Sequence, residues 1–423
     1  MADEAQIRAL LQAADNAMLQ GQRSDALALA AQARTAAPEN PDVLAACGLL
    51  ALRMGDLREA RALIEEAVAR EPGNPRFLVN LSMVLREERE SDAELKVLDQ
   101  ALALDPYFFT ANLQKGSLFE QQGNMKRATR AYHAALGSLR PGMQLPGGLR
   151  PALEHAQQVV RANFQRLEEL LQSRLAPLRR QYAGEAQDRV DDCLAVFLGT
   201  KRIYHAQPTM THFPRLPAIC FFERRDFPWI GAVEAATADM RDELGALLVS
   251  APQEFIPYVS HAPQSPLGQW RDLNNSKRWS ALFLQKDGKD YGDNIARCPR
   301  TMAALAQAPQ VQIPAIAPTV FFSRLEPRTR IPPHTGSSNT RLTVHIPLIV
   351  PPGCGFRVGS EVRGWQPGTA LIFDDTIEHE AWNDSDEPRV ILIFDIWNPL
   401  LTPAERELMT VATAGIAEFF DQA

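Results

Sequence analysis

The first third of the chain repeats itself at an interval of 34 residues. Prolines mark the period at Pro38, Pro72 and Pro106, and small residues mark it in two further registers. These registers are Ala14, Gly48, Ser82 and Gly116, and Ala33, Ala67, Ala101 and Ala135. Small residues let two helices approach closely, and a proline ends a helix because it cannot continue the hydrogen-bond ladder. Registers that agree at one period predict a stack of helical hairpins.

The pattern resembles the tetratricopeptide repeat, with about four units over residues 5–138. One unit of this kind cannot bury its own apolar face, so units stack into a superhelix whose concave side usually holds a peptide or protein. We therefore expect residues 1–138 to form an all-α superhelix with a peptide or protein partner. A spacer or a dimerisation surface is the alternative that the repeats leave open.

A break follows the repeats. Residues 139–150, LRPGMQLPGGLR, contain two prolines and three glycines, a composition that ends helices. Between residues 151 and 200, apolar residues such as Leu153, Val159 and Phe164 return at spacings typical of a helix. We interpret residues 139–204 as a linker with a helical segment, and residues 205–423 as a second domain.

Short strands are expected in the last quarter of the chain. From residue 318 the strand-like runs are PTVFFSRL, TRLTVHIPLIV, CGFRV, TALIF and RVILIFDIW, separated by turns such as PPGCG and WQPG. Many short strands with Gly/Pro turns favour a barrel or jelly roll. Helices are expected over residues 232–250 and from Thr402 onward, where a capping residue precedes a proline. The second domain is thus predicted to be a jelly roll with flanking helices.

Two histidines stand at expected strand ends in this region. His334 lies in PPHTGSSN, a polar loop leading into a strand, and His379 lies just past the strand TALIF. Imidazole is a ligand suited to Fe(II), so this pair predicts an iron site at the mouth of a barrel. Arg389 opens a strand that is apolar on both faces, and a buried guanidinium needs an anion. A dicarboxylate would supply that anion.

The usual set of two histidines and one carboxylate needs an Asp or Glu two residues after the first histidine. That position is Gly336. Three alternatives remain for the metal position that a carboxylate would otherwise fill: water occupies it, a halide occupies it, or the two histidines hold no metal. Asp374 and Asp375 precede His379 but are interpreted as bracing the turn or supporting the ligands from behind.

A family resemblance bears on these alternatives. The runs PHTGSSNTRLTVHIPL, ALIFDD, IEHEAWN and RVILIFDIWNPLLTPAER closely resemble the aspartyl/asparaginyl β-hydroxylases, 2-oxoglutarate oxygenases with a double-stranded β-helix, a jelly-roll and cupin-like fold. The likeness covers residues 208–410 and is most specific between 332 and 400. It implies that His334 and His379 bind Fe(II) without a protein carboxylate. It also implies that Arg389 binds the 5-carboxylate of 2-oxoglutarate, with Ser323 assisting and His345 in contact with the cosubstrate.

The resemblance implies a dioxygenase that uses O2 and 2-oxoglutarate to hydroxylate the β-carbon of an Asp or Asn in a peptide or protein, releasing succinate and CO2. Animal members carry an arginine for the substrate carboxylate where Thr343 stands here, and of their cysteine pair only Cys298 remains. A free or carrier-bound amino acid is therefore an alternative substrate. A halogenase that uses the position at Gly336, and a catalytically silent repeat-protein adaptor, are further alternatives.

Other polar residues of this region are candidates to line a substrate path. They are Arg341, Asn339, Trp279 and Ser280.

Composition and charge limit which partners and which cellular compartment we expect for the protein. The net charge is -7 and no basic run occurs, which argues against nucleic acid. The N-terminus lacks the pattern of a signal peptide and no run of 18 apolar residues occurs, so a cytoplasmic protein away from membranes is expected. Five scattered cysteines without a CxxC pair predict reduced thiols and no zinc cluster.

Overall fold

The computed structural model describes residues 4–140, 142–143, 145 and 147–421. The chain divides into two compact units, Met1–Gln187 and Asp188–Ala423. This division falls inside the segment 139–204 that the sequence marks as a linker. Parts of the expected domains and linker, namely residues 1–3, Pro141, Gln144, Pro146 and residues 422–423, lie outside the described residues.

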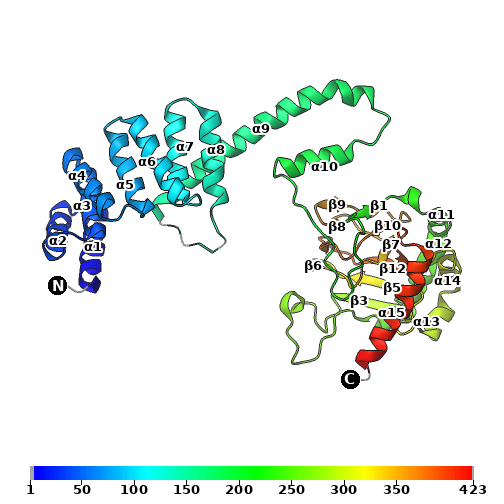
Figure 1. Cartoon of the computed structure of the whole chain (residues 1–423). Coiled ribbons are helices and arrows are strands. Elements are labelled where there is room, and N and C mark those ends of the chain that lie inside the picture. The colour runs from blue at the N-terminus through cyan, green and yellow to red at the C-terminus, as the bar shows by residue number, and fades with distance from the viewer. Residues whose placement is uncertain (1–3, 141, 144, 146, 422–423) are drawn as a thin grey trace. The chain divides into compact units, whose positions relative to one another are not determined.

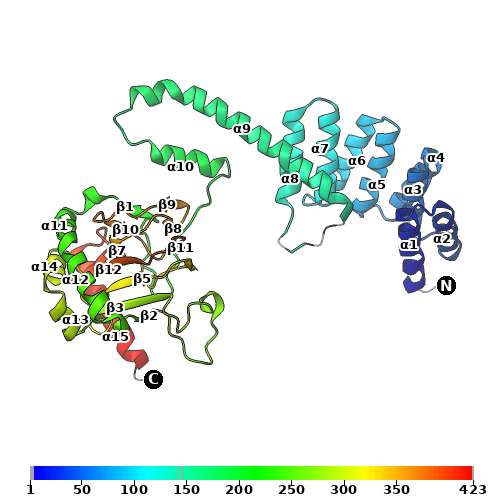
Figure 2. The same ribbon diagram turned by 180° about the vertical axis from the view of Figure 1, so that it is seen from behind.

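Helical hairpins build the first unit, as Figure 2 shows. The pairs are α1 (Glu4–Leu19) with α2 (Arg23–Ala36), α3 (Pro41–Met54) with α4 (Leu57–Arg70), α5 (Pro75–Glu87) with α6 (Ser91–Leu104), and α7 (Phe109–Gln121) with α8 (Met125–Gly137). A short helix η1 (Gly147–Leu149) leads into the long α9 (Arg150–Gln181), whose first turns pack on α8 through Leu153, Ala156 and Val160. The predicted tetratricopeptide superhelix is confirmed.

The small-residue registers mark the closest helix contacts. A Cβ on Gly48 would lie 2.5 Å from Cγ1 of Ile64, and one on Gly116 would lie 2.4 Å from Cδ1 of Tyr132. Ala33, Ala67, Ala101 and Ala135 are all fully buried. The period in the sequence therefore records where the paired helices touch.

Two antiparallel sheets form the second unit (Figure 1). The larger runs in the order β1 (Phe221–Phe222), β10 (Leu371–Phe373), β7 (Arg341–Ile349), β12 (Arg389–Trp397), β5 (Val320–Leu325), β3 (Trp279–Lys286) and β2 (Ile256–Pro257), with β4 (Lys289–Asp290) paired to β3. The smaller runs β6 (Thr329–His334), β11 (His379–Asn383), β8 (Cys354–Val358) and β9 (Glu361–Arg363).

The two faces of the larger sheet have different covers. One face packs on α11 (Ile230–Ala235), α12 (Thr237–Ser250) and α14 (Pro299–Leu305), with Leu282, Phe322 and Leu392 in that core. The other face meets the smaller sheet, where Leu325 and Ile391 pack with side chains of β6, β8 and β11. The predicted jelly roll with flanking helices is confirmed, and β12 is covered on both faces.

The structure tests several predictions about individual helices of the second unit. The helix expected over 232–250 is two helices, α11 and α12, which meet at Ala236. The final helix α15 (Pro403–Asp421) begins as predicted, because Thr402 and Glu405 cap each other through reciprocal side-chain hydrogen bonds. The helix α13 (Gly292–Arg297) was not predicted. No helix among the described residues is long and apolar enough to span a membrane.

Candidate functional site

A histidine pair faces across two neighbouring strands of the smaller sheet. His334 is the last residue of β6 and His379 is the first of β11, and the two are direct partners in the antiparallel register. Their ring centroids lie 4.0 Å apart. The sequence predicted a polar loop around His334. This prediction is wrong for the residues before His334, because Thr329–His334 forms the strand β6.

Each imidazole of the pair is held by its own backbone. Nδ1 of His334 donates to the carbonyl of Pro332 at 2.8 Å, and Nδ1 of His379 donates to that of Ile377 at 3.0 Å. A carbonyl can only accept, so the proton of each neutral ring is on Nδ1 and the lone pair is on Nε2. Burial lowers the pKa of His334 and lowers that of His379 well below its usual range. A neutral imidazole that presents its lone pair at Nε2 is the form that binds a transition metal.

A carboxylate comes close to Gly336. A Cβ added at that residue would lie 2.1 Å from Oδ2 of Asp375, so the space is already taken by this side chain. Burial and the nearby Asp395 raise the pKa of Asp375 to about 7. The described residues contain no group of three or more His, Cys, Asp or Glu side chains placed to hold a metal.

Asp374 and Asp375 have different tasks. The carboxylate of Asp374 accepts hydrogen bonds from the backbone and the hydroxyl of Thr376, which braces the turn before β11. The carbonyl of Asp375 accepts from the amide of Gly336 at 2.7 Å, which ties the chain after β6 to the turn before β11. Both segments that carry the histidines are thereby joined.

Arg389 is buried, and two of its guanidinium nitrogens have no hydrogen-bond partner among the described residues. It is 1% exposed, and neither Nε nor Nη2 has a hydrogen-bond partner among the residues that the structure describes. Burial lowers its pKa to about 10. The guanidinium carbon lies 4.9 Å from the ring centroid of Trp365. Buried charges are normally paired, so the unpartnered nitrogens Nε and Nη2 favour binding of an anion.

Ser323 and His345 lie on the same face of the larger sheet as Arg389. Ser323 is opposite Ile391 and His345 is opposite Ile393, and the strand period puts both isoleucines on the Arg389 face. Ser323 accepts a hydrogen bond from Nε1 of Trp279 at 3.1 Å. Nδ1 of His345 accepts from Nε1 of Trp365 at 3.3 Å, so its proton is on Nε2.

The remaining candidates separate into two groups. Arg341 forms an ion pair with Asp395 at 3.2 Å, and Trp279 lies 6.2 Å from His334, so both border the site. Asn339 instead holds the backbone of Phe213 by two hydrogen bonds. Ser280 alternates with Trp279 along β3 and faces the helices. Asn339 and Ser280 are therefore structural.

An aromatic series leads away from His334 along the inner face of the larger sheet. Trp270 lies 5.1 Å from His334 between ring centroids, and Trp279 stacks on Tyr258 at 4.2 Å. Tyr258 continues to Phe321 at 5.2 Å, Phe321 to Phe283 at 5.3 Å, and Phe283 to Tyr291 at 6.1 Å. Sequence reasoning missed this series because its members come from five separated segments.

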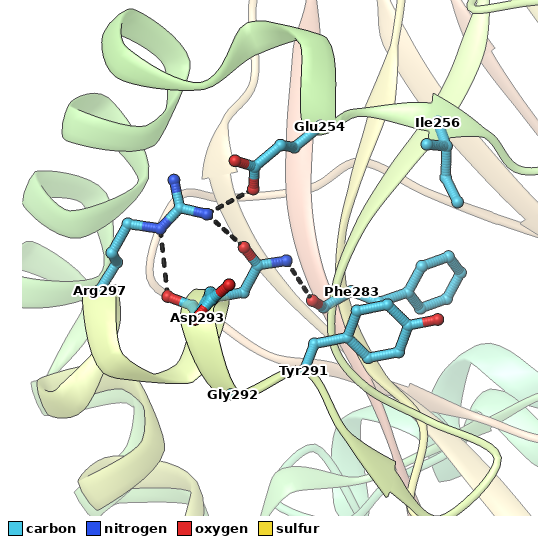
Figure 3. Close-up of a pocket in the computed structure, with 8 residues that line it drawn as sticks. Glu254, Ile256, Phe283, Tyr291, Gly292, Asp293 and Arg297 are labelled. Carbon is cyan, nitrogen blue, oxygen red and sulfur yellow. Dashed lines mark hydrogen bonds and ion pairs between the residues drawn. The ribbon is translucent and has the colours of Figure 1, made fainter.

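The aromatic series ends at a pocket of about 360 Å³ (Figure 3). Phe283, Tyr291 and Ile256 form its apolar wall, and the opposite wall is a network in which Arg297 binds Glu254 and Asn294. The pocket contains none of the histidines. The aromatic series runs between this pocket and the histidine pair.

Comparison with known proteins gives matches for both units. Residues 234–399 match the family model described as Aspartyl/Asparaginyl beta-hydroxylase, and residues 46–108 match that of the Tetratricopeptide repeat. The Ornithine lipid ester-linked acyl 2-hydroxylase of Rhizobium tropici is 36% identical over 186 residues, which are 43% of this chain and 62% of that protein. The human Aspartyl/asparaginyl beta-hydroxylase is 33% identical over 168 residues, 40% of this chain and 21% of that protein.

A tetratricopeptide-repeat protein of Thermus thermophilus is among the solved structures that match. It is 21% identical, with a TM-score of 0.32, and the match covers 42% of this chain and 97% of that one. The match to this chain spans less than two thirds of the length of either curated relative.

Proposed function

We propose that this chain, whose residues 234–399 match the aspartyl/asparaginyl β-hydroxylase family model, is an Fe(II)- and 2-oxoglutarate-dependent dioxygenase. The buried Arg389 carries the proposal, because its guanidinium has two nitrogens without a partner among the described residues. A binding module or adaptor would gain nothing from a buried guanidinium with two nitrogens unpartnered among the described residues. The family comparison supports hydroxylation, and the iron and cosubstrate are our inference.

The residues present fit such a metal. His334 and His379 would hold it through Nε2, since both Nδ1 atoms already donate to backbone carbonyls. Bound iron(II) would supply, with O2, the oxidation of a C–H bond coupled to conversion of 2-oxoglutarate into succinate and CO2. The protein's own tasks are to fix the ligands, hold the dicarboxylate and exclude water.

Three side chains would hold 2-oxoglutarate. Arg389 would bind its distal carboxylate through the unpartnered nitrogens, since a planar guanidinium matches a carboxylate in two parallel hydrogen bonds. The hydroxyl of Ser323 and Nε2–H of His345 can each donate a further hydrogen bond. A desolvated site strengthens these bonds, because little water competes for the same donors.

The surroundings of Gly336 favour water over a halide as the additional metal ligand. The carboxylate of Asp375 occupies the space that a side chain at residue 336 would fill. A carboxylate there can accept a hydrogen bond from a water, whereas an ionised one would repel chloride. The halogenase alternative is therefore less well supported than hydroxylation.

For the substrate, our first candidate is an Asp or Asn residue of a peptide or protein. The family description names these residues, and tetratricopeptide units commonly bind peptides. The first unit offers the surface for such a partner, and the hydroxylated atom would be the β-carbon.

A second candidate is an acyl chain. Thr343, which donates a hydrogen bond to Asp375, stands where a cation for a substrate carboxylate is expected. The aromatic series from Trp279 to Tyr291 offers an apolar lining over Trp279–Phe283, about 13 Å of strand. The relative from Rhizobium tropici is named as an acyl 2-hydroxylase.

The proposal is tested by anaerobic titration of the full chain with Fe(II) and 2-oxoglutarate, followed by the weak metal-to-ligand absorption in the visible. We expect the band in the wild type and in Asn339→Ala, and its loss in His379→Ala and Arg389→Ala. A folded wild type with no band and no succinate formation would leave the adaptor alternative in front. Peptide and acyl libraries, scored for a mass gain of one oxygen, then separate the two substrate classes.

A further inference from the structure

We infer that Trp365 is a positioning residue that presets both His345 and Arg389 for a carboxylate ligand, an inference that rests on the proposed function. Trp365 lies between β9 and β10 and is 6% exposed. Its ring stacks on Phe356, with centroids 5.3 Å apart and planes 20° apart. The indole is therefore fixed by packing before any ligand arrives.

The indole N–H selects one form of His345. Nε1 of Trp365 donates to Nδ1 of His345, so the neutral imidazole carries its proton on Nε2. Burial and the positive charge of Arg389 keep the pKa of His345 well below its usual range, so the ring stays neutral. A neutral imidazole without this donor could place its proton on Nδ1 and leave a lone pair on Nε2, which would repel a carboxylate.

His345 thus has the opposite tautomer to the two histidines of the pair. His334 and His379 present lone pairs at Nε2 because their Nδ1 atoms donate to carbonyls. His345 presents an N–H because its Nδ1 accepts. The same residue type serves as a ligand for a cation in two places and as a donor to an anion in the third, and the partner of Nδ1 decides which.

The face of the same indole holds Arg389. The guanidinium carbon lies 4.9 Å from the centre of the Trp365 ring, within the range of a cation–π contact. Such a contact stabilises a charge that has no polar partner for Nε and Nη2 among the described residues. The contact leaves Nε and Nη2 without a polar partner among the described residues, so these N–H groups remain for an anion in the guanidinium plane. One side chain therefore orients two donors toward one ligand.

Trp365→Phe separates the two effects, because phenylalanine keeps an aromatic face but has no N–H. Trp382 offers a matched control: its ring also lies under an arginine, Arg330, at 5.7 Å, but on the opposite side of β11 from His379 and Ala381. We would label the histidines of the full chain with 15N and assign His345 by comparison with His345→Gln. Affinity for 2-oxoglutarate would be measured by calorimetry with Mn(II).

In the wild type we expect the nitrogen shifts of a neutral His345 protonated at Nε2. In Trp365→Phe we expect a mixture of tautomers and about fivefold weaker binding of 2-oxoglutarate, the size of one buried hydrogen bond. The Michaelis constant for 2-oxoglutarate should rise in proportion while the maximal rate changes less than about twofold. Trp365→Leu should weaken binding further, and Trp382→Phe should match the wild type.

A wild-type His345 protonated at Nδ1 overturns the inference, and this measurement needs no variant to fold. Unchanged shifts and an unchanged affinity in Trp365→Phe overturn it as well. A wild type that shows the expected tautomer but binds no 2-oxoglutarate refutes the proposed function instead. A tautomer mixture in Trp365→Phe with unaltered affinity supports the contact to His345 but overturns its role in binding the carboxylate.

Discussion

Replacing Arg389 by methionine should stabilise the second unit while abolishing its affinity for 2-oxoglutarate. Burial lowers the pKa of Arg389 from 12.5 to about 10, which corresponds to about 3 kcal/mol of unfavourable charge burial. The shift is downward for a base, so this cost is present at every pH below about 10 and is relieved only above it. Methionine fills a similar volume without charge but loses the cation–π contact with Trp365, about 1–2 kcal/mol. The net gain should be about 1–2 kcal/mol.

The assay is urea unfolding followed by tryptophan fluorescence. The chain has six tryptophans, Trp229, Trp270, Trp279, Trp365, Trp382 and Trp397, and all lie in the second unit. The signal therefore reports this unit alone. Arg357→Met is the matched control, because Arg357 is paired with Glu378 and Glu380 and its loss should destabilise by about 1–3 kcal/mol.

The second part of the test compares the free energy of unfolding with and without 2-oxoglutarate. With Mn(II) present, 2-oxoglutarate at about a hundredfold excess over its dissociation constant should stabilise the wild type by about 2.7 kcal/mol and leave Arg389→Met unchanged. A methionine variant less stable than the wild type without ligand would refute the reasoning, because it would mean that the contacts of the guanidinium outweigh the cost of burying its charge.

Three further predictions concern other parts of the chain. His379→Ala should lose Fe(II) binding in equilibrium dialysis while its circular dichroism stays unchanged; metal retained at wild-type affinity would exclude His379 as a ligand. Gly116→Ala should destabilise the first unit by about 1–3 kcal/mol in thermal unfolding followed by circular dichroism, because the new methyl would overlap the ring of Tyr132; an unchanged midpoint would contradict the close contact. Burial alone would raise the pKa of Glu243, but hydrogen bonds from Thr301 and Arg300 lower this pKa below its usual value of 4.5. The ionised Glu243 side chain therefore stabilises the fold above pH 4.5, and this stabilisation is lost as the pH falls further. Glu243→Gln should therefore flatten the dependence of tryptophan-detected stability on pH below 4.5, and parallel curves for the two proteins would contradict this.

The repeats and the jelly roll could be predicted because each leaves a local pattern in the sequence. Helix contacts at Gly48 and Gly116 recur at a fixed spacing, and the burial of Arg389 could be inferred from the apolar residues on both faces of its strand. The family resemblance drawn from residues 332–400 is confirmed by the match of residues 234–399. The roles of His334, His379, Arg389, Ser323 and His345 stay predictions, although the structure brings these residues together.

Other features left no local pattern. The strand β6 contains Pro332 and Pro333, and prolines in a sequence argue against a central strand. They are tolerated here because β6 lies at the edge of its sheet. Trp365 stands between two short strands, and its contacts with His345 and Arg389 join segments at least 20 residues apart. The proximity of Asp375 to Gly336 depends in the same way on the pairing of β6 with β11. Such contacts exist only once the sheets have assembled.

The hydrogen bonds that orient the histidine pair come from the backbone of the pair's own chain segments. Each imidazole is fixed by a carbonyl two residues before it in its own chain segment, and strand pairing alone sets the distance between the rings. Both bonds run from a ring to the backbone, so neither needs a second side chain. Residues that line a substrate path can therefore change without removing the two hydrogen bonds that orient the rings.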